Sequence, residues 1–206
     1  FRPLGLRHSD YNFCDAAGRD GDDYYFLAGW FAFIVESERR AIMSIIQMPS
    51  PNFDERKGDG VSIILLHYTG MKNGQEALAR LTSEEAKVSS HYTVDEDGTV
   101  YQHVDEKMRA WHAGVSSWQG VKDINSVSIG IEIVNPGHEF GYREFSSSQI
   151  EAVTELCRSI QERHDIEFVL AHSDVAPDRK EDPGELFPWK TLAQNGIGVW
   201  PDISDE

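Results

Sequence analysis

The stretch VSIILLHYTG, residues 61–70, begins with an apolar run of strand length and continues into a histidine. A continuous apolar run without alternation is typical of a strand buried on both faces of a sheet. A second stretch, VSIGIEIV at 127–134, alternates strictly, as a strand with two different faces does. Its side chains divide into two rows: Ile129, Ile131 and Ile133 on one face, and Ser128, Gly130 and Glu132 on the other. A third strand is expected at 168–171.

Two further segments show the 3.6-residue periodicity of helices that pack on a sheet. Residues 73–81 predict the first of these helices. Residues 146–164 predict an amphipathic helix, in which Ser148 and Glu151 are expected to form a capping box. Its apolar stripe consists of Ile150, Val153, Leu156, Cys157 and Ile160.

A hairpin and the order of the elements indicate the fold class. Segments 90–94 and 99–104 flank Asp97-Gly98, a dipeptide that favours a β-hairpin. Strands that alternate with helices indicate an α/β sheet, and the hairpin adds an antiparallel pair, so the sheet should be mixed. We therefore predict an α/β fold with a single domain, a mixed central sheet flanked by helices, and a site at the carboxyl ends of strands.

The composition excludes some classes of function. The chain has 206 residues, 40% of them hydrophobic, which is enough for one domain with a sizeable core. It carries 19 basic and 35 acidic residues, and its formal net charge is −16. Because phosphate groups require a basic surface, no nucleic-acid partner is expected. The two cysteines, Cys14 and Cys157, form no disulfide framework or zinc knot, which favours a reducing compartment.

Residues 1–42 differ from the rest and are interpreted as an N-terminal extension before a domain at 43–206. The apolar run at 24–35 is short for a membrane span and follows aspartates, so neither a membrane anchor nor an export signal is expected. Met43 is a candidate for the true start of the protein; the alternative is that residues 1–42 form a surface helix or a partner-binding arm. A cytoplasmic location is expected, with a periplasmic one as the alternative if an export signal was removed before Phe1.

Two histidines stand directly after apolar strands, His67 after 61–66 and His172 after 168–171. Because sites in open α/β sheets form beyond the carboxyl ends of strands, the two imidazoles are expected to converge. A lone histidine in this position is more often structural, but two of them with a downstream carboxylate indicate a metal. Two imidazoles and one carboxylate leave a fourth position for water, as in catalytic zinc sites.

The loop AHSDVAPDRKEDPG, residues 171–184, offers several carboxylates: Asp174, Asp178, Glu181 and Asp182. Asp174 is so close to His172 that it would point away if the strand continued. Asp182 precedes Pro183-Gly184, a turn that can hold its carboxylate in place. The residues alone leave the choice open, with a preference for Asp182.

Other side chains are candidates for the chemistry. Glu132 is the candidate base, since a carboxylate in a strand is costly unless it is paired or used, although it could also face solvent at a sheet edge. Lys180 would offer positive charge to a developing oxyanion or form a surface ion pair. Trp111 and His112, in the loop 110–114, are candidates for a sugar-stacking wall, although Trp111 would serve equally in a core. Four other histidines are interpreted as surface or core residues: His8, His103, His138 and His164.

Together, six segments resemble the zinc-dependent N-acetylmuramoyl-L-alanine amidases of the amidase-2 family (AmpD/AmiD type), which are related to peptidoglycan recognition proteins and phage lysozyme-like amidases. The segments are LLHYTG (65–70), VSSHYTVDEDGTVYQHV (88–104), AWHAG (110–114), INSVSIGIEIVN (124–135), AHSDVAPDRKEDPG (171–184) and LFPW (186–189). They occur in the family's order, and their combination is specific to the family. The resemblance identifies 43–206 as an amidase-2 catalytic domain.

The resemblance also implies the roles of individual residues. It makes His67, His172 and Asp182 the zinc ligands, and it makes Glu132 and Lys180 the catalytic residues. The residues that it places in the substrate groove are Tyr68, His91, Trp111, His112 and Asn125.

The implied function is zinc-dependent hydrolysis of the amide bond between N-acetylmuramic acid and L-alanine in peptidoglycan fragments, or muropeptides, during cell-wall recycling or remodelling. A non-catalytic peptidoglycan-binding module of the same fold is the alternative. Such modules typically lack a zinc ligand, whereas all three ligand positions are filled here. A metalloprotease of another family is disfavoured because the sequence has no HExxH motif.

Overall fold

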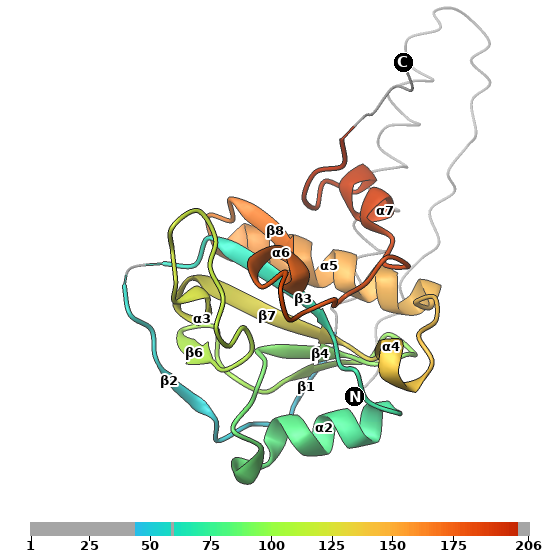
Figure 1. Cartoon of the computed structure of the whole chain (residues 1–206), viewed down its shortest axis with the longest axis horizontal. Helices are drawn as coiled ribbons and strands as arrows, with labels where there is room; N and C mark the ends of the chain where they lie inside the picture. The colour runs from blue at the N-terminus through green and yellow to red at the C-terminus, as the bar shows by residue number, and fades with distance from the viewer. Residues whose placement is uncertain (1–43, 59, 202–206) are drawn as a thin grey trace, which may run out of the picture. The chain divides into compact units, whose positions relative to one another are not determined.

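The computed structural model describes residues 44–58 and 60–201 (Figure 1). The expected extension at 1–42, with Cys14 and His8, and the candidate start at Met43 lie outside the described residues. The strands are β1 (Ile45–Gln47), β2 (Phe53–Glu55), β3 (Ile63–Tyr68), β4 (Tyr92–Val94), β5 (Val100–Gln102), β6 (Met108–Ala110), β7 (Ser128–Ile133) and β8 (Phe168–Ala171). The helices are α2 (Gly74–Thr82), α3 (Ile124–Val127), α4 (Gly137–Phe140), α5 (Ser147–Arg163), α6 (His172–Val175) and α7 (Trp189–Gln194), and a 3₁₀ turn covers Glu84–Ala86.

The central sheet has six strands in the order β1-β5-β4-β7-β3-β8. β3 pairs in parallel with both β7 and β8, and β7 pairs in parallel with β4. β4 and β5 form the antiparallel hairpin predicted around Asp97-Gly98. The predicted α/β class and the mixed sheet are therefore confirmed. β2 and β6 form a separate two-stranded antiparallel ribbon.

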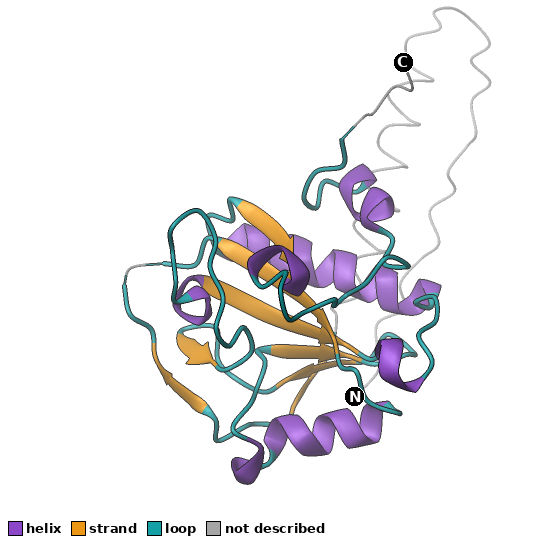
Figure 2. Ribbon diagram, in the orientation of Figure 1, coloured by secondary structure: helices purple, strands orange, loops and turns teal. Residues whose placement is uncertain are grey.

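The two faces of the sheet bury different side chains. One face packs on α5, the long helix behind the sheet in Figure 2, and forms a continuous apolar core. This core contains the predicted isoleucine row of β7 and the predicted stripe of α5: Ile129, Ile131, Ile133, Ile150, Val153, Leu156, Cys157 and Ile160. A smaller apolar cluster lies on the opposite face: Ile63, Leu65, Ala113, Ile124, Leu170 and Val175. Towards the carboxyl ends of the strands this opposite face becomes polar, and the site forms there.

The capping of α5 differs from the prediction. The Oγ of Ser146 accepts a hydrogen bond from the backbone N–H of Gln149 at 3.1 Å, and the Oε1 of Gln149 accepts one from the backbone N–H of Ser146 at 3.1 Å. The capping box predicted at Ser148 and Glu151 is therefore wrong, although both pairs have the same spacing. Gln149 is buried and also donates to the carbonyl of Val134 at 2.7 Å, which adds a contact that favours the earlier pair.

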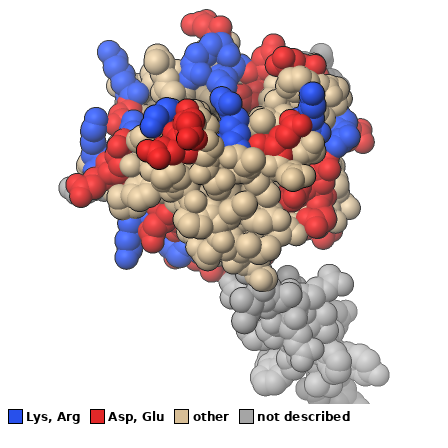
Figure 3. Space-filling model, turned by 90° about the horizontal axis from the view of Figure 1, so that it is seen from below, with Lys and Arg blue, Asp and Glu red and all other residues tan. Residues whose placement is uncertain are grey.

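Charged side chains of both signs are distributed over the surface. On the face shown in Figure 3, Lys and Arg side chains alternate with Asp and Glu side chains around an uncharged area. Within 44–58 and 60–201, no helix combines the length and the apolar character that crossing a membrane requires.

Candidate active site

Parallel pairing of β3 with its two neighbours brings the site residues together. His67 on β3 is in register with Glu132 on β7. Leu66 is in register with Ala171 at the end of β8, so His172 follows at the position next to His67. Because register partners in adjacent strands point to the same face, the three side chains project from one face at the carboxyl end of the sheet.

Asp182 returns to this edge from the loop that follows α6. Its Oδ2 lies 3.0 Å from the Nδ1 of His67 and 3.0 Å from the Nδ1 of His172. The backbone carbonyl of Asp182 also accepts a hydrogen bond from the N–H of Ser173 at 3.1 Å. The loop is thus fastened to the first turn of α6 at the point where its carboxylate meets the two imidazoles.

The other carboxylates of the loop do not reach this position. Asp174 accepts a hydrogen bond from the backbone N–H of Ala171 at 2.8 Å and so caps α6. The condition in the sequence argument, that the strand continues to Asp174, is not met, because β8 ends at Ala171 and α6 begins at His172. Asp178 is exposed, and Glu181 lies on the surface 3.4 Å from the Nδ1 of His138.

Three buried atoms form a triangle that fits a metal ion. The Nδ1 atoms of His67 and His172 are 2.9 Å apart, so all three sides of the triangle measure 2.9 to 3.0 Å. All three residues are buried, and among the described residues they are the one group with metal-ligand character. Four-coordinate zinc, with bonds of about 2.0–2.2 Å, has ligand–ligand distances only slightly longer than these.

The hydrogen bonds behind the triangle select, for each neutral imidazole, the tautomer that points an unprotonated nitrogen towards the triangle. The Nε2 of His172 lies 3.0 Å from the carbonyl oxygen of Ala113, which can only accept, so this nitrogen carries the proton. The Nδ1 of His172 is then a lone pair that faces the Asp182 carboxylate. Burial and the neighbouring His172 lower the pKa of His67 to about 4, so the His67 imidazole is neutral at pH 7. Lone pairs so close together repel one another unless a cation lies between them. The two imidazole nitrogens and the carboxylate oxygen therefore fit as ligands of a metal ion.

His112 extends this network behind His67. Its Nδ1 lies 3.0 Å from the Nε2 of His67, and its Nε2 lies 3.3 Å from the Oγ of Ser128. The hydroxyl of Ser128 donates to the carbonyl of Ile124 at 2.6 Å, so its oxygen is free to accept from His112. Burial and the neighbouring imidazoles hold the pKa of His112 well below its ordinary value. Each ring thus donates to the next, and this direction leaves the Nδ1 of His67 unprotonated towards the triangle.

Glu132 lies beside the triangle with one oxygen unused. Burial raises its pKa to about 8; the negative charge of Asp182 adds to this shift and the positive charge of Lys180 opposes it. Its Oε2 is enclosed and has no hydrogen-bond partner within the described part of the chain. A carboxyl group held in this way near neutral pH is suited to accept and return a proton.

The loop after α6 brings two cationic side chains to the site. Lys180 lines the cavity beside Glu132 and Asp182. Arg179, which the sequence analysis did not single out, donates to the carbonyl oxygens of Ala113 and Val115. It therefore fixes the carbonyl that orients His172, and its position beside Lys180 was the only signal in the sequence.

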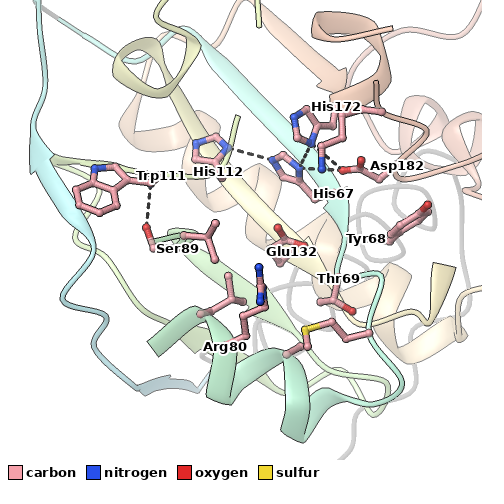
Figure 4. Close-up of a pocket in the computed structure, with 15 residues that line it drawn as sticks. His67, Tyr68, Thr69, Arg80, Ser89, Trp111, His112, Glu132, His172 and Asp182 are labelled. Atoms are coloured by element: carbon pink, nitrogen blue, oxygen red, sulfur yellow. Dashed lines mark hydrogen bonds and ion pairs between the residues drawn. The ribbon is translucent and has the colours of Figure 1, made fainter. Parts of the chain in front are cut away.

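A cavity lies between α2 and the polar face of the sheet (Figure 4). The close-up shows Trp111 and Tyr68 at opposite ends, with His112 and Glu132 between them. The indole N–H of Trp111 donates to Asp54 at 2.8 Å. The hydroxyl oxygen of Tyr68 lies 3.0 Å from the Nδ1 of His138, one of the histidines interpreted from the sequence as surface or core residues. Both rings are thus held in place at the ends of the cavity.

Two residues expected in the substrate groove, His91 and Asn125, are buried and are not among the residues that line the cavity. The Oδ1 of Asn125 accepts hydrogen bonds from the backbone N–H groups of His112 at 3.1 Å and Ala113 at 2.8 Å. The Nδ1 of His91 accepts one from the N–H of Gly130 at 3.0 Å, and its Nε2 lies 3.1 Å from a backbone carbonyl. These contacts position the loop and the strand that carry the site, and substrate contact by either residue stays a prediction.

Comparisons with known proteins agree with this geometry. The family model described as N-acetylmuramoyl-L-alanine amidase matches residues 57–185. AmiD, an N-acetylmuramoyl-L-alanine amidase of Escherichia coli (strain K12), is 42% identical over 156 residues, which cover 69% of this chain and 55% of AmiD. AmpD, the 1,6-anhydro-N-acetylmuramyl-L-alanine amidase of the same organism, is 33% identical over 162 residues, which cover 69% of this chain and 87% of AmpD. The chain thus spans about half the length of AmiD and most of the length of AmpD.

Solved structures show the same relationship. E. coli AmiD in complex with the substrate anhydro-N-acetylmuramic acid-L-Ala-D-γ-Glu-L-Lys is similar with a TM-score of 0.63 and 37% identity, over 74% of this chain and 68% of that one. A selenomethionine derivative of AmpD is similar with a TM-score of 0.66 and 28% identity, over 73% of this chain and 93% of that one.

Proposed function

Because this chain belongs to the N-acetylmuramoyl-L-alanine amidase (amidase-2) family, we propose that it is a zinc-dependent amidase of peptidoglycan fragments. The bond hydrolysed is the amide between N-acetylmuramic acid and L-alanine, in cell-wall recycling or remodelling. The similarity to AmiD, whose structure contains a muropeptide of this kind, supports the substrate class. The observation that carries the proposal is the buried triangle of His67, His172 and Asp182 next to an unpartnered carboxyl oxygen of Glu132.

Each side chain has a role that follows from its position. The triangle holds the metal; zinc, when bound, supplies a Lewis acid for the scissile carbonyl and lowers the pKa of water. Glu132 takes the proton from the attacking water at Oε2 and passes it to the leaving amine of L-alanine. Lys180 places a positive charge near the carbonyl oxygen, where negative charge develops, and a donor of this kind contributes about 10²–10³ in rate.

Metal analysis combined with muropeptide turnover tests the proposal. We expect about one zinc ion per chain, hydrolysis that a chelator abolishes, and recovery when zinc is returned. Glu132→Gln should keep the zinc and lose about 10²–10⁴ in kcat, whereas His67→Ala should lose both zinc and activity.

Two results would contradict parts of this account. A wild-type rate in the zinc-loaded Glu132→Gln protein would show that Glu132 is not the base. A protein that binds muropeptide without taking up zinc or cutting the amide would instead be a non-catalytic binding module of the same fold.

A further inference from the structure

A cation without a partner lies in the cavity wall. Arg80 belongs to the last turn of α2 and lines the cavity with Ala77 and Leu81 of the same helix. Figure 4 shows its guanidinium pointing from α2 towards Glu132. No hydrogen bond or ion pair joins this guanidinium to any other residue within 44–58 and 60–201.

The other described arginines are all engaged in contacts with the protein, which makes Arg80 unusual. Each of them has a carboxylate or a backbone carbonyl among its partners: Arg56 on Glu106 O, Arg109 on Asp123, Arg143 on Glu96, Arg158 on Glu155, Arg163 on Glu106 and Arg179 on Val115 O. The chain carries 35 acidic against 19 basic residues, so carboxylates are abundant. An arginine that is left unpaired in such a chain, and that lies in the wall of the active-site cavity, is free for a ligand.

Helix stability alone does not account for this placement. A positive charge in the last turn of a helix is favourable wherever its side chain points. The buried face of α2, formed by Ala77, Leu78 and Leu81, fixes the rotation of the helix. That rotation brings Arg80, the neighbour of Leu81, to the edge of the cavity.

We propose that Arg80 binds a carboxylate of the stem peptide and so determines which muropeptides the enzyme prefers; this inference rests on the proposed function. A guanidinium matches a carboxylate with two parallel N–H···O bonds, which gives direction as well as affinity. In a stem peptide with γ-linked glutamate, as in the AmiD complex, the linkage leaves the α-carboxylate free. That group lies within two residues of the scissile amide, a reach of about 7 Å in extended chain.

The charges around the cavity favour an anion at this position. Its wall contains two carboxylates, Glu132 and Asp182, and two side-chain cations, Lys180 and Arg80. Asp182 contacts both imidazoles of the triangle, and no ion pair joins Glu132 to either cation among the described residues. A carboxylate of the ligand can therefore bind Arg80 without displacing a partner in the protein.

Three muropeptides that differ only in their carboxylates test the assignment on the zinc-loaded full chain. The first is anhydro-N-acetylmuramic acid-L-Ala-D-γ-Glu-L-Lys, the second carries a carboxamide in place of the glutamate α-carboxylate, and the third carries a carboxamide at its C-terminal lysine. KM and kcat are measured for each, and Kd is measured by calorimetry with the Glu132→Gln protein. Wild type should lose about 10–100-fold in KM and Kd with one of the two amidated peptides, which identifies the carboxylate that is bound.

The variants separate recognition from folding and from the chemical step. Arg80→Ala should bind all three peptides equally weakly with kcat nearly unchanged, and Arg80→Lys should recover part of the preference. Lys190→Ala, which removes an exposed cation on α7, is the matched control and should behave as wild type. Arg80→Ala with the wild-type preference, or wild type without any preference, would overturn the inference. If no peptide is cut, the proposed function fails, but the Kd values with and without Arg80 still test carboxylate binding.

Discussion

Each histidine of the site uses both ring nitrogens, so its tautomer is set by a neighbour rather than by solvent. The carbonyl of Ala113 orients His172, and His112 orients His67. Support of this kind behind metal ligands commonly contributes 10–100-fold in metal affinity. Gly130 makes room for it, because a Cβ at this position would lie only 2.4 Å from the Nδ1 of His112.

We therefore expect Gly130→Ala and His112→Ala to weaken zinc binding by about 10–100-fold in a protein that still folds. In the first variant the new methyl group displaces the His112 ring from its contact with His67, and in the second the ring is absent. Competition with a chromogenic chelator measures the zinc Kd, and His112→Gln should recover part of the affinity because its amide oxygen can accept from His67.

His103→Ala is the control for a buried histidine of the same sheet that does not support the metal. His103 contacts Thr93 at 2.8 Å and the carbonyl of Met48 at 2.8 Å, so its loss should lower the free energy of unfolding without changing the zinc Kd. If Gly130→Ala and His112→Ala bound zinc as tightly as wild type, the network behind His67 would have no role in metal binding.

At the scale of elements, the site depends on strands that are held from behind by one helix. α5 contributes its apolar stripe to the core under β3 and β7. Its first turn is fastened by Ser146, whose Oγ caps the helix and also donates to the carbonyl of Glu96 at 2.6 Å. The capping residue thus joins α5 to the loop of the β4–β5 hairpin.

Ser146→Ala should lower the free energy of unfolding by about 1–2 kcal/mol, because both the cap and the bond to the hairpin loop are lost. Ser148→Ala and Glu151→Ala, the residues expected from the sequence to form the capping box, are exposed and should change it by about 0.5 kcal/mol or less. Urea denaturation at neutral pH distinguishes these values. A larger effect at Ser148 than at Ser146 would contradict the observed cap.

On the scale of the whole molecule, a carboxylate distant from the cavity connects three parts of the chain. Glu106 accepts hydrogen bonds from Tyr92 of β4, from Arg163 at the end of α5 and from His164. Burial raises the pKa of Glu106, but the hydrogen bonds from Arg163, Tyr92 and His164 outweigh it and lower the pKa to about 2. Glu106 is therefore expected to make the free energy of unfolding depend on pH in the acidic range.

The direction of this pH dependence follows from the pKa of Glu106 in the unfolded and in the folded protein. The unfolded glutamate has a pKa near 4.3, so the stabilising contribution is complete above that value and is lost as the pH falls towards about 2. It amounts to at most about 3 kcal/mol. Unfolding measured between pH 2 and 7 should show a smaller pH dependence for Glu106→Gln than for wild type in this window. The exposed Glu139→Gln on α4 is the control, and equal pH dependence in the Glu106→Gln and wild-type proteins would exclude the contribution.

The sequence by itself determined the elements and the residues from which the site is chosen. The apolar run before His67, the alternation at 127–134 and the helical stripe at 146–164 are local patterns. They predict strands and helices because side-chain spacing along the backbone decides which face can be buried. The positions of His67 and His172 after strands indicated a metal before any contact was known.

Only the tertiary structure decided which side chains meet. Local spacing gave only a preference for Asp182 over Asp174, and the family resemblance implied the choice; its physical reason lies in where α6 begins and in the bond between Ser173 and the Asp182 carbonyl. Nor did the sequence indicate that Arg80 reaches the edge of the cavity, because the burial of Ala77, Leu78 and Leu81 sets the rotation of α2. Such contacts join residues far apart in the chain, and their geometry depends on how strands and helices pack, which no local pattern encodes.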